Sequence, residues 1–337
     1  MDAVGAPWPA AVGVSGGSDS LALMLLLRDW AKGAGLKPPQ VLTVDHGLRP
    51  EAADEARKVR LWARKAGLSA HVLTHRGKAP VSDVEAAARA LRYRLMGAWA
   101  AKAGCAAVYV AHTRDDQAET FLIRLARGSG LDGLSAMRPL APYPDGAFAA
   151  LKLARPLLGL ARHSLQTYLE EAGHPWLDDP MNADPRFTRA RIRLAWPRLE
   201  ALGLTRDRLA GAAVHLGRAR SALETVNRVL LQQGCTPYKN GLLLDSAILA
   251  CAPQELGLRA LSQVLMAVSQ NPYRPRFERL QGLYWAILDG SLGAGRTLHG
   301  CRVAPAPKAG QPFGQGTLLV QPEKSRRQTG KNKLSSQ

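Results

Sequence analysis

The chain has 337 residues, and its 45 Lys and Arg outnumber its 27 Asp and Glu to give a formal net charge of +18. That excess of positive charge indicates a polyanionic partner, of which nucleic acid is the first candidate. A basic bias shared by all proteins of a genome would produce the same net charge. The length suffices for two domains, and the lack of any run of 18 apolar residues argues against a membrane-spanning helix.

The sequence also argues against a signal peptide and against a cysteine motif. The N-terminus has no basic region followed by an apolar stretch, so we expect no signal peptide and a cytoplasmic protein. The four cysteines, Cys105, Cys235, Cys251 and Cys301, include no Cys-x-x-Cys pair. This argues against a disulfide framework, a zinc site or an iron–sulfur cluster, and it favours reduced, buried thiols.

The first predicted element is a strand over residues 12–14 that leads through a glycine-rich turn into an apolar helix. Two glycines in the turn permit positive φ and let a ligand approach the backbone, and the helix N-terminus that follows attracts anions. We therefore predict a cradle for phosphate or pyrophosphate. Its residues are Ser15, Gly16, Gly17, Ser18, Asp19 and Ser20.

Asp19 is an unusual neighbour for a phosphate, because the two negative charges repel. The position makes sense if Mg²⁺ bridges the carboxylate to the phosphates, so Asp19 is a candidate metal ligand and catalytic residue. A simpler alternative is a capped helix, with Ser18 as the N-cap and Asp19 in the first turn. The string is neither a Walker A nor a dinucleotide-binding motif. It resembles the pyrophosphate loop of the N-type ATP pyrophosphatases, which split ATP into AMP and pyrophosphate.

Strands and helices then alternate along the chain. Further strands are predicted over residues 41–45, 71–73 and 107–111, and helices over residues 51–66, 82–102 and 114–127. The alternation predicts an α/β fold with a doubly wound parallel sheet. His46 directly follows a strand, at the edge where such sheets bind ligands, and is a further candidate for the ATP site.

The helix over residues 82–102 carries a polar face beside its apolar one. Glu85 and Arg89 are four positions apart and are expected to form a solvated ion pair. Arg92 is the better candidate for a substrate or phosphate contact, and we assign it a catalytic role.

The helix over residues 114–127 begins where the fourth predicted strand ends. Asp116, Glu119 and Thr120 lie at i, i+3 and i+4, so the two carboxylates face the same space and can bind Mg²⁺ or a substrate ammonium group. Acids in a first turn also complement the helix dipole, which is the structural alternative. His112, at the end of the strand, is a candidate general base or a candidate hydrogen-bond donor to phosphate.

An acidic loop and a run of arginines follow. Residues 128–146 are predicted to form loops and residues 162–172 a helix. The acidic loop covers residues 176–184, and the arginines are Arg186, Arg189, Arg191 and Arg193. Adjacent clusters of opposite charge suit a substrate that is cationic on one side and phosphorylated on the other. Salt bridges within the loop and a solvated helix explain the pattern equally well.

Beyond residue 203 the composition changes, and we place a domain boundary there. Helices are predicted over residues 205–234, 253–268 and 275–288, with short strands over residues 241–245 and within 295–320. The prediction is therefore a catalytic domain over residues 1–203, a mainly helical domain over residues 204–322 and a basic, disordered tail over residues 323–337.

Together these motifs resemble one family closely, the bacterial tRNA(Ile)-lysidine synthetases. The resemblance covers about residues 12–200 and is loose beyond them, around residues 300–303. Many enzymes share the pyrophosphate loop, whereas the strings Asp-His-Gly-Leu-Arg and Asp-Asp-Gln-Ala-Glu-Thr are more specific. The matching residues are Ser15–Ser20, Val44–Arg49, Glu85 with Arg89, Arg92 and Tyr93, Ala111 and His112, Asp115–Thr120, Arg124–Leu125 with Arg127–Gly130, Arg155–Leu158, Trp176 with Asp179, Asn182 and Asp184, and Arg189 with Arg191–Arg193.

Two positions depart from the family pattern. Thr113 stands where the family usually has a second His, so we assign it no role. Ala190 replaces the Asn of the usual run Arg-Asn-Arg-Ile-Arg, which weakens any polar role at that position and keeps the arginines.

The resemblance implies a two-step reaction on the wobble cytidine of a tRNA(Ile) with a CAU anticodon. ATP adenylates the C2 carbonyl oxygen and releases pyrophosphate. The ε-amine of free L-lysine then attacks C2 and expels AMP, leaving lysidine. The resemblance also implies ATP and Mg²⁺ as cofactors and a tRNA-binding domain after residue 203, and it allows a homodimer.

The residues suit these steps. The resemblance implies that the glycine loop holds pyrophosphate and that Asp19 shares Mg²⁺ with it, while Arg92 and the metal stabilise charge on the phosphates. Asp116 and Glu119 would line the ammonium group of lysine, and Arg189 or Arg191 would bind its carboxylate.

Three other functions share parts of this pattern. A tRNA thiolation enzyme uses the same loop but needs reactive or cluster-binding cysteines, and none here is suitably paired. An amide-forming enzyme of small metabolites does not need the basic charge or the C-terminal domain. A catalytically idle RNA-binding protein does not require Asp19, Arg92, Asp116 and Glu119.

Overall fold

The computed structural model describes residues 1, 4–45, 47, 51–75, 84–178, 184–271, 273–308 and 311–323. By its internal contacts the chain divides into two compact units, Met1–Arg218 and Ala219–Gln337. Several predicted features lie outside the described residues: His46, Asp179, Asn182, the side chain of Glu85 and residues 324–337 of the predicted tail.

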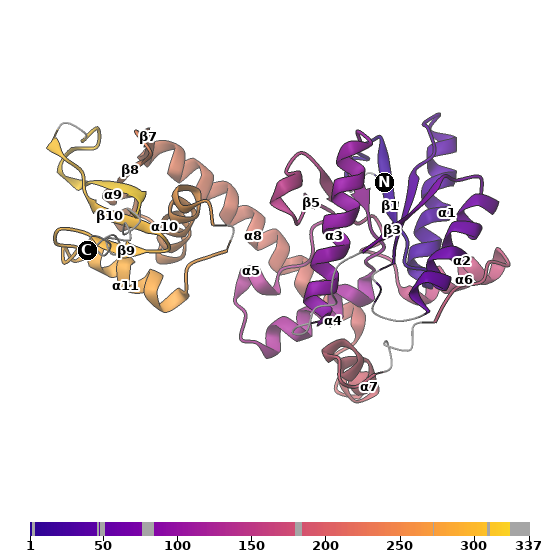
Figure 1. Ribbon diagram of the computed structural model, residues 1–337. Coiled ribbons are helices and arrows are strands. Elements are labelled where there is room, and N and C mark those ends of the chain that lie inside the picture. The colour runs from indigo at the N-terminus through magenta and orange to yellow at the C-terminus, as the bar shows by residue number, and fades with distance from the viewer. Residues whose placement is uncertain are drawn as a thin grey trace, which may run out of the picture. The chain divides into compact units, whose positions relative to one another are not determined.

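The first unit carries the predicted alternation of strands and helices (Figure 1). Its elements are β1 (Ala10–Gly13), α1 (Ser18–Gly33), β2 (Gln40–Asp45), α2 (Ala52–Lys65), β3 (Ala70–Thr74), α3 (Val84–Lys102), β4 (Ala107–Tyr109), α4 (Arg114–Ala126), α5 (Leu131–Leu134), β5 (Leu140–Pro142), β6 (Lys152–Ala154), α6 (Arg162–Glu171), α7 (Thr188–Ala201) and the start of α8 (Arg206–Gly234). Three short elements, α5, β5 and β6, were not predicted, because three or four residues are too few to show a period.

Six strands form one sheet in the order β3-β2-β1-β4-β6-β5, in which neighbours are parallel except for the β5–β6 pair. The predicted doubly wound α/β sheet is therefore confirmed. From β1 the chain first adds β2 and β3 on one side and then returns to place β4 on the other. Open α/β sheets bind ligands in the crevice at such a point, beyond the carboxyl ends of the two central strands. The functional residues should therefore follow β1 and β4.

Both faces of the sheet are buried. Ala10 and Val12 of β1 belong to a core that includes α1, α2 and α6, whereas Ala11 belongs to a second core with α3. Figure 1 shows α1, α2 and α6 gathered on one side of the sheet and α3 on the other. Burial on both faces explains why the central strands are apolar runs instead of alternating ones.

Helix α4 packs against other helices. Its Ala118 forms a small core with Trp196 of α7 and Leu209 of α8. Four partly buried side chains close around this core: Phe121, Leu122, Ile192 and Leu199. The contact leaves the first turn of α4, with its acids, directly after β4.

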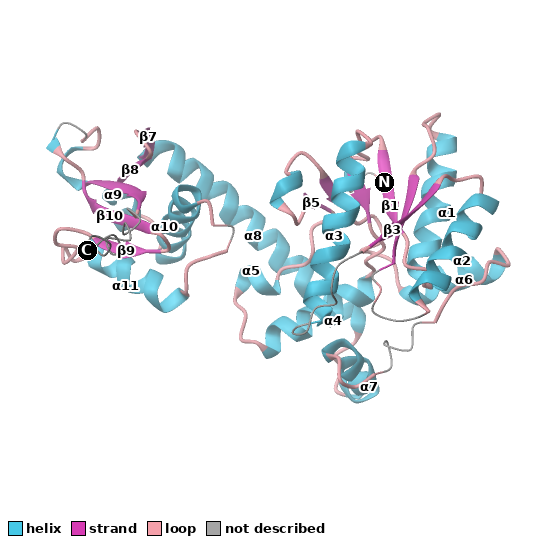
Figure 2. Ribbon diagram, viewed as in Figure 1, coloured by secondary structure: helices cyan, strands magenta, loops and turns pink. Residues whose placement is uncertain are grey.

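The second unit contains an antiparallel sheet packed against helices (Figure 2). Its elements are β7 (Cys235–Tyr238), β8 (Gly241–Asp245), α9 (Ser246–Cys251), α10 (Gln254–Ser269), α11 (Phe277–Leu288), β9 (Arg296–Leu298), β10 (Cys301–Pro305) and β11 (Thr317–Pro322), with the strands in the order β7-β8-β11-β10-β9. The periodicity predicts α8, α10 and α11. It predicts neither the short helix α9 nor the pairing of Asp245 with Thr317 across the sheet. Among the described residues, no helix has the length and apolar character that crossing a membrane requires.

Candidate active site

The turn after β1 keeps its backbone open at the start of α1. Gly16 has a φ of +96°, and a Cβ there would lie 2.6 Å from Cδ1 of Leu177, so the position needs glycine. Gly17 is the N-cap of α1, and no side chain caps the helix. The capping role considered for Ser18 is therefore wrong. The described residues offer no acceptor to the N–H groups of Gly16, Gly17 and Ser18, which are left to face an anion.

The hydroxyl group of Ser20 holds this loop in shape through two hydrogen bonds. Oγ of Ser20 donates to the carbonyl oxygen of Gly17 at 2.9 Å and accepts from the N–H of Ser15 at 3.2 Å. Each such bond contributes about 1 kcal/mol. The cradle is thus preformed in the free protein, as a phosphate site should be.

Asp19 projects from the first turn of α1 toward α6. Its Oδ2 accepts a hydrogen bond from Nε of Arg162 at 2.8 Å. Burial raises the pKa of Asp19, Arg162 opposes this effect, and the carboxylates of Asp116 and Asp115 add to it. The loop after β1 and the helix after β4 therefore share one electrostatic environment.

The first turn of α4 is capped by its own side chains. The N–H and hydroxyl of Thr113 donate to Oδ2 of Asp116 at 2.8 and 2.9 Å, and the N–H of Asp116 donates to Oγ1 of Thr113 at 3.4 Å. This capping box explains why Thr113, to which the sequence assigned no role, suits this position. It also orients Asp116, because only its second oxygen is left to face other groups.

Three carboxylates and three guanidinium groups meet beside the loop. Arg162 contacts all three acids, with 2.8 Å between its Nε and Oδ2 of Asp19, 3.5 Å between Nη2 and Oδ1 of Asp116, and 3.8 Å between Nη1 and Oε1 of Glu119. We call this the carboxylate–guanidinium cluster. Its members are Asp19, Asp116, Glu119, Arg162, Arg189 and Arg193.

Helix α7 supplies the other two arginines. Nη1 of Arg189 lies 3.5 Å from Oδ1 of Asp116, and Nε of Arg193 lies 2.6 Å from Oε1 of Glu119. These arginines share a face because they are one helical turn apart. Arg191 lies on another side of α7, where its guanidinium donates to the carbonyl of Pro185 and the hydroxyl of Thr188.

The structure therefore brings together most of the predicted lysine-binding residues. Asp116, Glu119 and Arg189 meet, whereas Arg191 does not reach them. Arg193 stands beside Glu119 instead, and the sequence pattern did not separate it from the other arginines. Ala190, the second departure from the family pattern, is buried in the packing of α7.

Asp116 is ionised in this arrangement. Burial works against its charge, but Arg162, together with the N–H of Thr113 and with Arg189, holds the pKa of Asp116 below its usual range. A carboxylate with a low pKa suits the binding of a cation better than it suits proton abstraction.

Arg162 is the functional candidate that the sequence analysis missed. It is the first residue of α6, and its own N–H donates to Oδ2 of Asp115 at 2.9 Å. Burial lowers its pKa, but the acids around it, Asp19 first, hold that pKa above its usual range. One signal was present in the sequence. A cation in the first turn opposes the helix dipole, so Arg162 needs an acidic partner from elsewhere.

His112 follows β4 and is largely buried. Burial, together with the charges of Arg89 and Arg155 and against the attraction of Asp116, lowers its pKa to about 3. The ring is therefore neutral at physiological pH, and its Nδ1 has no hydrogen-bond partner among the described residues. A neutral ring fits a hydrogen bond to substrate better than it fits a general base.

Arg92 lies on the exposed side of α3. Its neighbour Arg89 rests on Tyr93, with 3.2 Å between Nη2 and the phenol oxygen and 5.1 Å from the guanidinium carbon to the ring centroid. The predicted contact of Arg92 with phosphate stays a prediction.

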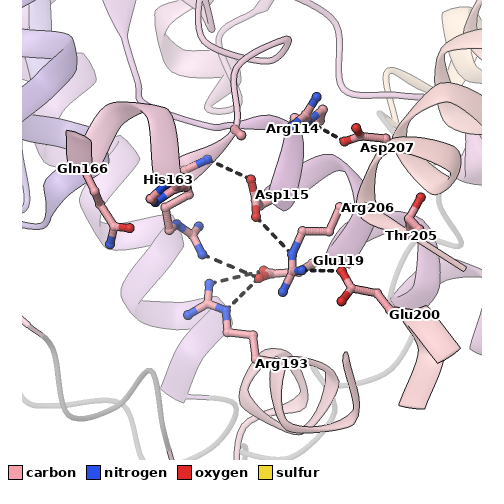
Figure 3. A pocket seen from close by; sticks show the side chains of 12 residues that line it. Arg114, Asp115, Glu119, His163, Gln166, Arg193, Glu200, Thr205, Arg206 and Asp207 are labelled. Carbon is pink, nitrogen blue, oxygen red and sulfur yellow. Dashed lines mark hydrogen bonds and ion pairs between the residues drawn. The ribbon is translucent and has the colours of Figure 1, made fainter. Parts of the chain in front are cut away.

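A pocket of about 520 Å³ adjoins the cluster between α4, α6, α7 and the start of α8 (Figure 3). Glu119, Arg162 and Arg193 form its boundary with the cluster. The other residues that line it are Arg114, Asp115, Ala161, His163, Gln166, Glu200, Thr205, Arg206 and Asp207. The lining carries four acids and four arginines, which suits a small ligand with charges of both signs.

Arg206 holds one wall of this pocket in place. Its guanidinium lies 4.3 Å from the ring centroid of Trp196, and it pairs with Asp115 at 3.1 Å and Glu200 at 2.8 Å. Figure 3 shows Arg206 between these two acids. Because Asp115 also accepts the N–H of Arg162, the pocket wall and the cluster are directly connected.

The donor set fits a metal that arrives with a nucleotide. Within the described ranges, no three His, Cys, Asp or Glu side chains are grouped to hold an ion by themselves. Mg²⁺ in nucleotide sites usually takes one or two carboxylates and completes its shell with phosphates and water. Asp19, beside the open loop, is a suitable single carboxylate.

The four cysteines are unpaired thiols, of which Cys105 and Cys301 are buried.

Comparison with known proteins identifies the family. The sequence profile of the PP-loop domain matches residues 8–198, which include the loop and the whole cluster. The tRNA(Ile)-lysidine synthase of Methylobacterium nodulans is 39% identical over 328 residues, spanning 96% of this chain and 93% of that protein. The chain belongs to the tRNA(Ile)-lysidine synthase family.

A second curated relative agrees with this family. The tRNA(Ile)-lysidine synthase of Rhodopseudomonas palustris is 47% identical over 224 residues, 65% of this chain and 63% of that protein. Among solved structures, the U34-tRNA thiolase NcsA from Methanococcus maripaludis aligns with a TM-score of 0.49 and 16% identity, over 64% of this chain and 71% of that one. The predicted family resemblance is confirmed, and the chain is an enzyme of the PP-loop class.

Proposed function

We propose that the chain joins free L-lysine to C2 of the wobble cytidine in a tRNA(Ile) with a CAU anticodon. ATP adenylates the C2 oxygen with release of pyrophosphate, and the ε-amine of lysine then displaces AMP. One observation carries the proposal: Asp19 of the loop and Glu119 of the pocket contact the same guanidinium group, that of Arg162. A single side chain thus connects a phosphate cradle to a pocket for a small charged molecule.

The loop of residues 15–20 is the proposed ATP site. The N–H groups of Gly16, Gly17 and Ser18 donate to the leaving pyrophosphate at the positive end of α1. Asp19 is the residue that would hold Mg²⁺, and the ion would supply positive charge to the phosphates. A contact from His46 to ATP and one from Arg92 to phosphate remain part of the proposal.

The pocket is the proposed lysine site. Its volume falls within the range of about 300–1,000 Å³ that small-molecule sites occupy. The ε-ammonium group is placed toward Asp116 and Glu119, and the α-carboxylate on Arg189 or Arg193. Arg193 replaces Arg191 in this assignment, because Arg193 lines the pocket. His112 is neutral, and its Nδ1 has no hydrogen-bond partner in the described part of the chain, so we assign it a hydrogen bond to the target nucleotide.

The region after residue 203 is the proposed tRNA-binding part. Three aromatic side chains on α11 and the loop before it are exposed, Tyr273 by 77%, Phe277 by 60% and Trp285 by 47%. Arg276 and Arg279, also exposed, accompany them. Aromatic rings that stack on bases, beside arginines that neutralise phosphates, are typical of surfaces for unpaired RNA.

The test is incorporation of radiolabelled lysine into RNA in the presence of ATP and Mg²⁺. An unmodified tRNA(Ile) with a CAU anticodon is compared with a methionine tRNA that has the same anticodon. We expect label in the first and not in the second. ATP cleavage without label in either RNA would favour a thiolation enzyme or one that acts on small metabolites.

A further inference from the structure

The carboxylate–guanidinium cluster is electrically balanced without any ligand. Three carboxylates face three guanidinium groups, and each acid already has a cation within 4 Å. A cation that arrives at Asp19, or an ammonium group that arrives at Asp116 and Glu119, meets an oxygen that is already paired. One guanidinium group therefore has to leave before either ligand binds well.

Arg162 is the group whose departure frees the most. Asp116 keeps Arg189, and Glu119 keeps Arg193, whose Nε and Nη2 lie 2.6 and 3.3 Å from its two oxygens. Asp19 has Arg162 as its ion-pair partner in the described chain. Removing the side chain of Arg162 from the cluster takes this ion-pair partner from Asp19 and leaves one unbalanced negative charge for an incoming cation.

The backbone of Arg162 is anchored separately from its side chain. Its backbone N–H is tied to Asp115 at 2.9 Å, so α6 stays in place while the side chain changes its position. The side chain is 25% exposed and borders the pocket. Its Nε faces Asp19, one residue beyond the open N–H groups of the loop.

ATP brings the anion that competes for this side chain. A guanidinium group binds phosphate oxygens in the same forked manner as carboxylates, and a triphosphate carries more charge than one aspartate. We propose that Arg162 exchanges its carboxylate partners for phosphate oxygens when ATP binds, so that the lysine site becomes available only after ATP is in place. This inference rests on the proposed function, and it makes Arg162 both a phosphate contact and the link between the two substrates.

The exchange has a measurable consequence. Lysine must displace Arg162 by itself when ATP is absent, but not when ATP has already drawn the side chain away. ATP therefore tightens lysine binding, and by linkage lysine tightens ATP binding by the same factor. A side chain that only braces the fold would produce no such coupling between the two ligands.

The experiment measures binding of radiolabelled L-lysine to the full chain by equilibrium dialysis. It is done with Mg²⁺, with and without the non-cleavable analogue α,β-methylene-ATP, and without tRNA. For the wild type we expect lysine to bind at least about tenfold more tightly with the analogue, since one lost ion-pair partner in a partly buried site is worth roughly that much. For Arg162→Gln we expect binding without the analogue to be as tight as for the wild type or tighter, with the coupling reduced to about threefold or less.

Two further variants sharpen the result. Arg28→Gln removes an arginine that pairs with Asp29 on the surface of α1, and it should keep the wild-type coupling. Arg162→Lys keeps the charge but loses the fork that reaches three acids, and it should show intermediate coupling. Thermal unfolding checks that each variant is folded.

Equal lysine affinity with and without the analogue in the wild type overturns the inference, whatever the variants do. So does full coupling in folded Arg162→Gln. Failure of the proposed function is distinct, because the wild type would then bind no lysine under either condition and would incorporate none into tRNA.

Discussion

Two strand-to-helix turns lie side by side at the centre of the sheet, because β1 and β4 are paired. The turn after β1 ends in Gly17, and no side chain caps α1. The turn after β4 ends in Thr113, and the first turn of α4 is closed by the bonds between Thr113 and Asp116. Helix N-termini expose unpaired N–H groups, which are left open at the start of α1 and are partly capped at the start of α4.

The difference divides the chemistry between the two turns. An uncapped N-terminus with two glycines offers N–H donors to phosphate. A capped N-terminus has no such donors to spare, but its capping acid, Asp116, has one oxygen left over, and Glu119 one turn later adds another carboxylate. The same backbone unit thus makes an anion site after β1 and a cation site after β4, with Arg162 between them.

Asp19→Asn should have the largest effect, because it removes the only acid of the anion turn. We expect tRNA-dependent release of pyrophosphate to fall by about 10²–10³-fold, the size seen when one electrostatic contact to a transition state is lost. Asp29→Asn, on the surface of the same helix, is the matched control. Activity of Asp19→Asn within threefold of the wild type would remove Asp19 from the ATP site.

Gly16→Ala should have the second-largest effect. The added Cβ meets Leu177 at 2.6 Å and φ is positive, so we expect a loss of about 1–3 kcal/mol of stability and at least tenfold weaker ATP binding. Gly17→Ala is the neighbouring control, since its nearest contact is 3.9 Å and its φ is −71°. Calorimetric titration with an ATP analogue measures both variants. Equal affinities would mean that the shape of the turn does not matter.

Thr113→Ala tests the capped turn. Loss of an N-cap costs about 1 kcal/mol, so the midpoint of urea unfolding should fall, whereas Thr113→Ser should restore most of it. Because Asp116 loses the hydroxyl donor of Thr113 and keeps only the backbone N–H, we also expect lysine incorporation to fall further than ATP binding does. A variant with unchanged stability would show that the capping box contributes nothing in solution.

His112→Gln should have the smallest effect on stability at neutral pH, where the ring is uncharged, and its effect on stability should appear as the pH falls. The pKa of His112 is about 3 in the folded chain and about 6.5 when unfolded, so the unfolded state binds the extra proton between these values. Wild-type stability should therefore fall as the pH drops from 6.5 to 5, by about 1–2 kcal/mol more than that of the variant. Urea unfolding at pH 7.5 and pH 5 measures this, and parallel losses would place a charged or exposed ring at this position.

Local patterns were enough to predict much of this site. The loop follows from its glycines, and the shared direction of Asp116 and Glu119 follows from their i, i+3 spacing, as the contacts of both with Arg162 show. Helical periodicity likewise placed α3, α4 and α6 within two residues of their ends. The same rule, applied to the arginine run, could have paired Arg189 with Arg193 instead of Arg191.

Features that depend on distant pairing could not be predicted. Arg162 meets Asp19 across 143 positions, and nothing in its own helix shows which acid it will face. The strands β5 and β6 are held by the sheet instead of by any period of their own, and β8 finds β11 only in the folded second unit. Long-range contacts of this kind carry the connection between the two halves of the site.

The claim that Asp19 serves ATP and Glu119 serves lysine is tested most directly by the variant Glu119→Gln. The control variant is Glu171→Gln, at the exposed end of α6. Pyrophosphate release and incorporation of labelled lysine are measured in the same reaction with tRNA(Ile), ATP and Mg²⁺. We predict that pyrophosphate release stays within about threefold of the wild type while lysine incorporation falls at least about 100-fold and adenylated tRNA accumulates. Normal lysine incorporation, or an equal loss of both activities, would contradict the assignment of the acids after β4 to lysine.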